Sequence, residues 1–119
     1  MYKIEIPMKL PGLNEYIGAC RTKAILGASM KKRVEQDIMW FLKPMPKFEK
    51  SIRIKFTWVE ANTKRDLDNI CFAKKFILDA MVKLGKIKDD NRKFVCGFED
   101  NFTYGKEYKV ILEISEVQI

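Results

Sequence analysis

Closely spaced aspartates are the residues of this chain whose types and spacing point most directly to chemistry. Asp66 and Asp68 are separated by one leucine, and Asp89 and Asp90 are adjacent further along the chain. If residues 66 and 67 are extended, the first two carboxylates project to one side, where their like charges repel and a divalent cation relieves the repulsion. Three or four hard oxygen ligands from two segments suit Mg²⁺ or Mn²⁺ bound with water.

The rest of the composition excludes several other kinds of site. The chain has no histidine, which excludes Ser-His-Asp triads, Cys-His dyads and imidazole zinc sites. Cys20, Cys71 and Cys96 lie far apart without a CxxC motif, which favours a reduced, cytoplasmic protein. The longest stretch without a charged residue is the seven residues Ala24–Met30, so we expect no membrane span and no signal peptide.

Charge and length indicate one basic domain. The 119 residues carry 23 Lys and Arg against 16 Asp and Glu, a net charge of +7. No repeat or linker divides the sequence, so residues 1–119 are expected to form a single domain. A basic protein favours an anionic partner, most often nucleic acid, although an ordinary basic surface explains the same total.

Hydrophobic periodicity predicts the elements that must position the aspartates. The expected strands are 2–6, 51–60, 93–99 and 106–116, the last two joined by a hairpin loop at 101–105. Ser29 is expected to cap a helix that ends at Leu42 before Pro44, and residues 7–14 are expected to form an irregular loop. A second helix is expected from about Asp68 to Leu84, ended by Gly85. The order β-α-β-α-β-β predicts an α+β domain on a small mixed sheet with two main helices.

The predicted helix at 68–84 has two different faces. At 100° per residue one face is apolar and carries Ile70, Ala73, Ile77, Ala80, Met81 and Leu84. Asp68, Lys75 and Asp79 form a column on the opposite face, and Lys74 points away from that column. An ordinary solvated face with a Lys75–Asp79 pair and Asp68 as the N-cap explains the same pattern.

These motifs together resemble the RusA family of Holliday junction resolvases, and most of all its phage and prophage branch. The resemblance is close over residues 64–95 and is carried by Lys64-Arg65-Asp66-Leu67-Asp68-Asn69, Lys75, Asp79-Ala80, Gly85 and Asp89-Asp90. It implies a RusA-like fold and a Mg²⁺-dependent endodeoxyribonuclease that resolves four-way junctions by paired symmetric phosphodiester hydrolysis in DNA recombination and repair. It also implies a homodimer that acts on DNA in the cytoplasm of a bacterial or phage-infected cell, with no membrane partner and no small-molecule cofactor.

The resemblance also assigns roles to individual residues. The family's metal-binding and catalytic aspartates fall on Asp66, Asp68 and Asp90. Its catalytic lysine falls on Lys75 when it is counted back from Asp79. Counted forward from Asp68 it falls on Phe72, because the helix here is about three residues longer, and this leaves Lys74 as the alternative. The lysine would stabilise charge on the phosphate or protonate the leaving 3′-oxygen. Asp79 and Asp89 are left without an assigned role.

DNA binding would need further basic residues around these aspartates. The candidates for phosphate contacts are Lys31, Lys32, Arg33, Lys64, Arg65, Arg92 and Lys93. Two other hypotheses explain the same residues: a module that binds branched DNA without cutting it, and a Mg²⁺-dependent enzyme that acts on a small phosphorylated substrate. A dimer is expected because a four-way junction has approximate two-fold symmetry and one chain offers a single aspartate cluster.

Overall fold

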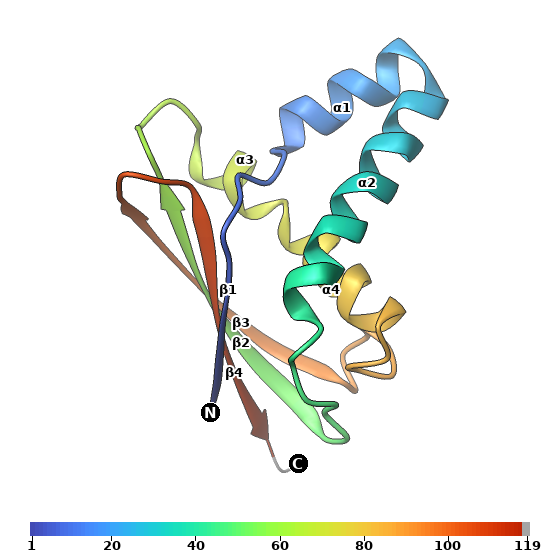
Figure 1. The fold of residues 1–119 in the computed structure, drawn as a ribbon, viewed down its shortest axis with the longest axis vertical. Coiled ribbons are helices and arrows are strands. Elements are labelled where there is room, and N and C mark those ends of the chain that lie inside the picture. The colour runs from blue at the N-terminus through green and yellow to red at the C-terminus, as the bar shows by residue number, and fades with distance from the viewer. Residues whose placement is uncertain (118–119) are drawn as a thin grey trace.

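The chain forms a four-stranded sheet covered on one face by helices (Figure 1). The computed structural model describes residues 1–117. In chain order the elements are β1 (Tyr2–Ile6), α1 (Leu13–Thr22), α2 (Ala24–Leu42), β2 (Ser51–Glu60), α3 (Leu67–Cys71), α4 (Lys74–Lys83), β3 (Val95–Tyr104) and β4 (Lys109–Val117). The α+β class expected from the sequence is confirmed.

The strands lie in the order β1-β4-β2-β3. β4 pairs antiparallel with both β1 and β2, whereas β3 runs parallel to β2. Because parallel strands need a long crossover, the chain between β2 and β3 has room for α3 and α4. β2 is paired on both sides, and only Arg53 and Lys55 of this strand are exposed. The central strand therefore leads directly into the segment that carries the Asp66 and Asp68 motif.

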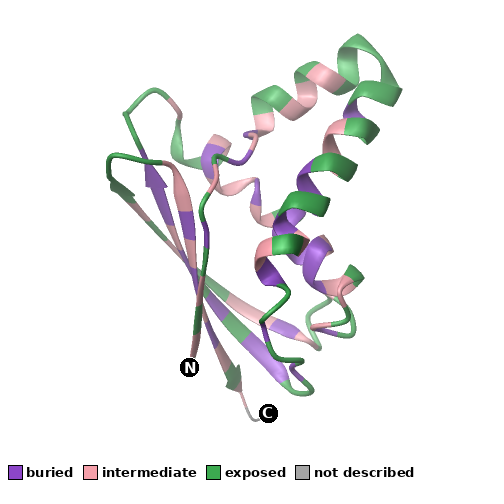
Figure 2. Ribbon diagram, in the orientation of Figure 1, coloured by how far each residue is buried: buried purple, intermediate pink, exposed green. Residues whose placement is uncertain are grey.

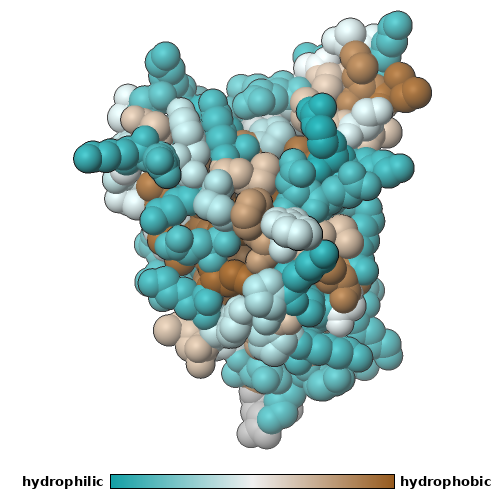
Figure 3. Space-filling view, viewed as in Figure 1, coloured by the Kyte–Doolittle hydropathy of each residue, from teal (hydrophilic) through white to brown (hydrophobic). Residues whose placement is uncertain are grey.

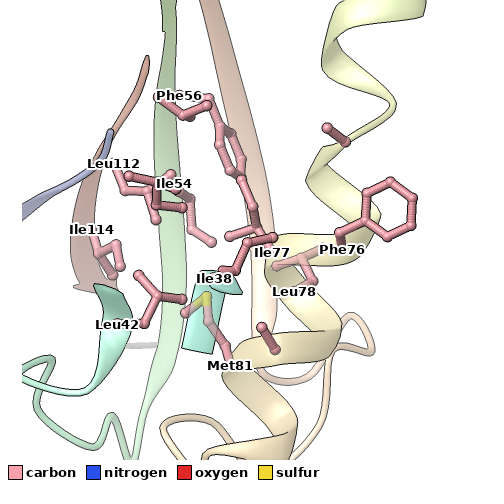
Figure 4. Close-up of a cluster of buried hydrophobic side chains, with 14 of the residues drawn as sticks. Ile38, Leu42, Ile54, Phe56, Phe76, Ile77, Leu78, Met81, Leu112 and Ile114 are labelled. Carbon is pink, nitrogen blue, oxygen red and sulfur yellow. The ribbon is translucent and has the colours of Figure 1, made fainter. Parts of the chain in front are cut away.

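The hydrophobic core lies between the sheet and the two helices α2 and α4. Figure 4 shows Ile38 of α2 and Ile77 and Met81 of α4 directed toward Ile54 and Leu112 of the sheet. All five side chains are at most 2% exposed. In Figure 2 the buried residues of α2 follow the side that faces α4, whereas α1 has no buried residue. Packing against the core therefore fixes α4 and the adjoining part of α2.

The expected loop is confirmed up to Gly12, and the expected helix end at Leu42 is confirmed. The expected helix start at Ser29 was wrong, because α2 begins at Ala24, and the additional helix α1 begins at Leu13. The start of α1 is capped by a residue distant in sequence: the backbone N–H of Asn14 donates to Asn69 Oδ1 at 2.9 Å. Gly12 is so close to the same amide that a Cβ there would lie 2.6 Å from Asn69 Oδ1. A cap supplied by another element leaves no local sequence signal.

The single helix expected at 68–84 is two helices, α3 and α4, with Phe72 and Ala73 between them. The N–H groups of Lys75 and Phe76 donate to carbonyls three residues back, so the chain winds more tightly there than an α-helix. The expected end is confirmed, because Gly85 follows α4 with φ of 71°, the left-handed conformation that glycine adopts readily. The expected apolar face is largely confirmed, with only Leu84 of that set half-buried.

The expected hairpin between the last two strands was also wrong. β3 and β4 follow one another in sequence, but β2 lies between them in the sheet. Their connection crosses the end of β2, where the N–H of Gly105 donates to the carbonyl of Glu60 at 3.0 Å. The physical reason is that β2 is too apolar to be an edge strand, so it takes the central position and pairs on both sides.

Two further findings concern the cysteines and the possibility of a membrane-spanning helix. Cys20, Cys71 and Cys96 are all free thiols. Of the helices formed by residues 1–117, none has both the length and the apolar character needed to cross a membrane.

Candidate active site

Asp66 and Asp68 lie at the start of α3, just after the loop that follows β2. Asp66 is the N-terminal flanking residue of this helix, with extended backbone (φ −70°, ψ 155°), and its carbonyl accepts the N–H of Ile70 at 3.1 Å. Both aspartate side chains are exposed. Within residues 1–117 neither carboxylate takes part in an ion pair or a side-chain hydrogen bond. The described residues therefore leave the two like charges uncompensated.

Arg65 fixes the loop that carries these aspartates. Its Nε and Nη2 donate to the two oxygens of Glu60, each at 2.8 Å, and its Nη1 donates to the carbonyl of Leu10 at 2.9 Å. The Glu60 carboxylate raises the pKa of Arg65, and both side chains are largely buried. This two-pronged pair ties the loop to the end of β2. The geometry favours a structural role for Arg65 over the DNA contact expected for it.

Lys75 and Asp79 lie one turn apart on α4 and meet Asp90 of the following loop. The Lys75 Nζ lies 3.1 Å from Asp79 Oδ1 and 3.4 Å from Asp90 Oδ2. The second oxygen of Asp79 lies 3.2 Å from the Nζ of Lys31 on α2. The expected Lys75–Asp79 pair is therefore present, and it extends to a third acidic group and a second lysine.

These contacts shift the pKa values of all three α4 and α2 groups. The Asp79 carboxylate raises the pKa of both Lys75 and Lys31 above the ordinary lysine value. Burial alone would raise the pKa of Asp79, but the ammonium groups of Lys75 and Lys31 outweigh it and hold this pKa below its usual value. Each of the three groups is therefore stabilised in its charged form.

An open hollow of about 310 Å³ lies over these residues. Its charged lining residues are Lys31, Lys75, Asp79, Lys83, Asp89 and Asp90. Asp89 shapes the turn, because its Oδ1 accepts the N–H of Asp90 at 2.8 Å and its Oδ2 accepts the Asn91 amide at 3.0 Å. The hollow is a place where a lysine ammonium and a carboxylate face solvent together.

Lys74 has a different environment, although it adjoins Lys75. Its Nζ lies 2.7 Å from Asp100 Oδ2 on β3, and the other oxygen of Asp100 accepts the indole N–H of Trp58 at 2.8 Å. The same ammonium lies 4.4 Å from the centre of the Phe98 ring. The Lys74 side chain is 17% exposed, against 55% for Lys75. Lys74 thus joins α4 to the sheet, and Lys75 is the lysine that is open to a substrate.

The expected metal ligands are not gathered into one cluster. Among residues 1–117 no three Asp, Glu or Cys side chains lie close enough together to hold a metal ion. Asp90 lines the hollow, whereas Asp66 and Asp68 do not. The donor chemistry does fit a hard divalent cation, since Asp66 and Asp68 are exposed carboxylates whose charge the described residues leave unpaired.

The other basic candidates are exposed on several elements: Lys32 and Arg33 on α2, Lys64 before α3, and Arg92 and Lys93 before β3. Figure 3 shows a largely hydrophilic face with a hydrophobic patch at the end of the α1–α2 hairpin, where Ile25 is 69% exposed. Lys31 differs from the exposed basic candidates, because it forms ion pairs with Glu35 and Asp79.

A comparison with models of protein families shows to which family the chain belongs. The model of the family described as endodeoxyribonuclease RusA matches residues 6–115. The chain belongs to the RusA family. A search of curated proteins found no match. The RusA match covers every element from β2 to β3 in full, including the hollow and both groups of aspartates. The resemblance stated from residues 64–95 is confirmed, and the family supports a nuclease activity.

Sequence reasoning missed three acidic partners of this RusA-family site. Glu60 and Asp100 hold Arg65 and Lys74, and Glu35 on α2 lies beside Lys31. A signal for Glu35 was available, because it lies between Val34 and Ile38 on the buried side of a helix. Asp100 had none, because its partners depend on the parallel pairing that sets Asp100 opposite Phe56.

Proposed function

We propose that this chain is a Mg²⁺-dependent endodeoxyribonuclease that resolves four-way DNA junctions in recombination and repair by paired, symmetric phosphodiester hydrolysis. Membership of the RusA family supports the nuclease chemistry. The observation that carries the proposal is the exposed Lys75 ammonium 3.4 Å from Asp90 Oδ2 in an open hollow. An ammonium and a carboxylate at such a place suit an anionic backbone and the cation that accompanies it.

Asp66, Asp68 and Asp90 would hold the divalent cation, Mg²⁺ or Mn²⁺. Hard carboxylate oxygens without competing histidine or thiolate ligands favour these ions over zinc. When bound, the cation supplies Lewis acidity for the phosphate and for the attacking water.

Lys75 would stabilise the negative charge that develops on the phosphate, or protonate the leaving 3′-oxygen. Its ammonium is suited to this role because Asp79 orients it without burying it. The raised pKa of Lys75 keeps the group charged at neutral pH. Lys74 is less suited, because its ammonium already donates to Asp100, which Trp58 holds in place through the other carboxylate oxygen.

Positioning of the DNA would depend on phosphate contacts from exposed basic side chains. The candidates supported by exposure are Lys32, Arg33, Lys64, Arg92 and Lys93. Lys31 and Arg65 are weaker candidates, because acidic side chains already pair with them.

The working form would be a homodimer, since one chain carries one Asp66, Asp68 and Asp90 set and two symmetric nicks need two. β1 is an edge strand and Trp40 of α2 is 65% exposed, which leaves apolar surface and an open strand edge for a second copy. Light scattering should give about twice the 14.0 kDa chain mass. A monomer that still makes both nicks in one binding event would contradict the dimer.

The decisive assay incubates the purified protein with a labelled four-way junction, a duplex of the same sequence and a nucleotide set, each with Mg²⁺ or with EDTA. The proposal requires Mg²⁺-dependent cutting of the junction at symmetric positions in preference to the duplex. Tight junction binding without cutting under any metal condition would instead identify a branched-DNA-binding module. Hydrolysis of the nucleotides alone would identify an enzyme of small phosphorylated substrates.

A further inference from the structure

A chain of alternating charges runs between α2 and α4 to the candidate active site. Its six members, in order of contact, are Lys83, Glu35, Lys31, Asp79, Lys75 and Asp90. They come from α2, α4 and the loop before β3. We call this set the α2–α4 ion-pair chain. Three positive and three negative groups make it neutral as a whole.

Glu35 is the most deeply buried member of this chain. Its side chain is 1% exposed, its Oε1 accepts a hydrogen bond from Lys83, and its Oε2 lies 3.8 Å from the Nζ of Lys31. Within the described residues Oε2 has no hydrogen-bond partner. A buried carboxylate is costly, and an apolar residue of similar volume would usually be at least as stabilising. Stability alone therefore gives no reason for an acid at this position.

Lys31 connects the buried carboxylate to the active-site helix. Its Nζ lies 3.2 Å from Asp79 Oδ2, and the Nζ of Lys75 lies 3.1 Å from Asp79 Oδ1. Asp79 thus shares its charge between two ammonium groups, one from α2 and one from its own helix. Lys32, the next residue, is exposed and forms no ion pair among residues 1–117.

This arrangement governs how strongly Lys75 is attracted to Asp79. A carboxylate that already pairs with Lys31 holds a second ammonium less strongly than a carboxylate that is free. Without Lys31, the full charge of Asp79 would compete with the DNA phosphate for the ammonium of Lys75. Glu35 favours the inward position of Lys31, because an outward turn of Lys31 would leave the buried carboxylate with Lys83 as its remaining partner.

We propose that Lys31, anchored by Glu35, is a positioning residue that shares the charge of Asp79 and so leaves the Lys75 ammonium available to the phosphate. Lys31 is on this account not a DNA contact. The inference rests on the proposed nuclease function, in which Lys75 acts on the phosphate.

The test compares Lys31→Met with Lys32→Met, a matched loss of one positive charge from the neighbouring position. Single-turnover cutting of a four-way junction is measured at saturating protein with Mg²⁺, and junction Kd is measured in EDTA over a range of salt. Lys31→Met should lower the saturated rate about ten-fold and leave the salt slope of binding unchanged. Lys32→Met, at a candidate phosphate contact, should reduce the slope by about 1. Lys23→Met, at an exposed lysine just before α2 that is not a candidate contact, should leave the saturated rate unchanged. Lys31→Arg should restore most of the rate.

If Lys31→Met lowers the salt slope as Lys32→Met does and leaves the saturated rate unchanged, Lys31 is a phosphate contact and the proposal is wrong. A double variant adds an independent check. In an Asp79→Asn background Lys31→Met should cause no further loss of rate, because Lys31 acts through Asp79. A full additional ten-fold loss would overturn the proposal.

A readout without DNA separates this inference from the nuclease function. Acetylation of Lys75, followed by peptide mass spectrometry in EDTA, should slow at least two-fold in Lys31→Met and stay unchanged in Lys32→Met. An unchanged rate in both variants would overturn the positioning role. A wild-type protein that cuts no junction would refute the proposed nuclease function, and the acetylation result would still decide whether Lys31 controls Lys75.

Discussion

The two groups of aspartates in this RusA-family protein have opposite electrostatic surroundings. Asp66 and Asp68 are exposed at the start of α3, and no cation from residues 1–117 pairs with them. Asp79 pairs with two lysines, and Asp90 with one of them. Lysine side chains therefore compensate the charge of Asp79 and Asp90, whereas the described residues leave the charge of Asp66 and Asp68 uncompensated. We interpret Asp79 as the residue that orients Lys75. We interpret Asp66 and Asp68, joined by Asp90, as the carboxylates that recruit metal.

The largest effect is expected from the uncompensated pair. Asp66→Asn and Asp68→Asn should each lower the rate of junction cutting about a thousand-fold, because losing a metal ligand removes several kcal/mol of transition-state stabilisation. Asp90→Asn should do the same. Junction binding should be retained and should tighten without metal, since repulsion of DNA is reduced.

Asp37→Asn is the matched control, because Asp37 is another exposed aspartate, on α2, and forms no ion pair among the described residues. Its cutting rate should equal that of the wild type. Cutting by Asp66→Asn and Asp68→Asn at near wild-type rates in Mg²⁺ would show that the metal is held elsewhere.

Neighbouring lysines give the next largest effect. Lys75→Ala should lower the single-turnover rate about a hundred-fold, as expected when a group that stabilises charge or transfers a proton is lost. Lys74→Ala should leave the single-turnover rate within a few-fold of the wild-type rate. It should lower the free energy of unfolding by about 1–3 kcal/mol, because Asp100 loses a charge-assisted hydrogen bond. Urea denaturation and kinetics on the same samples measure both. Equal losses of rate, or the reverse order, would contradict the assignment.

Arg65 and Lys64 differ in the same way, one held by an acid and one exposed. Six phosphate contacts imply a log–log salt slope of about −5 for junction binding, and Lys64→Met should reduce its magnitude by about 1. Arg65→Met should leave the slope unchanged and destabilise the fold by about 3–5 kcal/mol, because Glu60 becomes an unpaired buried charge. A flat salt titration of the wild type would exclude a nucleic-acid partner.

The smallest effect is a pH dependence of stability caused by Asp79. Its pKa is lowered in the folded protein, so its contribution to stability is complete above the unfolded value near 4 and is lost as pH falls through the folded value. Unfolding monitored from pH 6 to pH 2 should therefore show a steeper acid destabilisation in the wild type than in Asp79→Asn. Identical pH profiles would show that the lysine pairs of Asp79 do not contribute.

The sequence predicted best what depends on local pattern. Alternation of apolar and charged residues placed β1 and β2 at their observed bounds, and Gly85 marked the end of α4. The Lys75–Asp79 pair followed from their spacing of one helical turn. Local pattern failed where the structure depends on contacts between distant segments. α1 is capped by Asn69, and β3 pairs with β2 instead of β4.

The same limit explains what was missed at the candidate site. Lys31 was expected to contact DNA because it lies in a basic run, Lys31-Lys32-Arg33, and no local rule separates it from Lys32. Only the packing of α2 on α4 brings Lys31 to Asp79. The family motif supplied the aspartates and the lysine, but the partners that set their charge come from other elements of the fold.

A Mn²⁺ titration of the metal-free protein, followed by electron paramagnetic resonance, tests most directly whether the uncompensated aspartates are the metal site. We expect the wild type and Asp79→Asn to bind Mn²⁺, and Asp66→Asn and Asp68→Asn to lose binding at least ten-fold. Binding that survives in Asp66→Asn and Asp68→Asn but is lost in Asp79→Asn would contradict the account, because it would place the metal at Asp79 and not at Asp66 and Asp68.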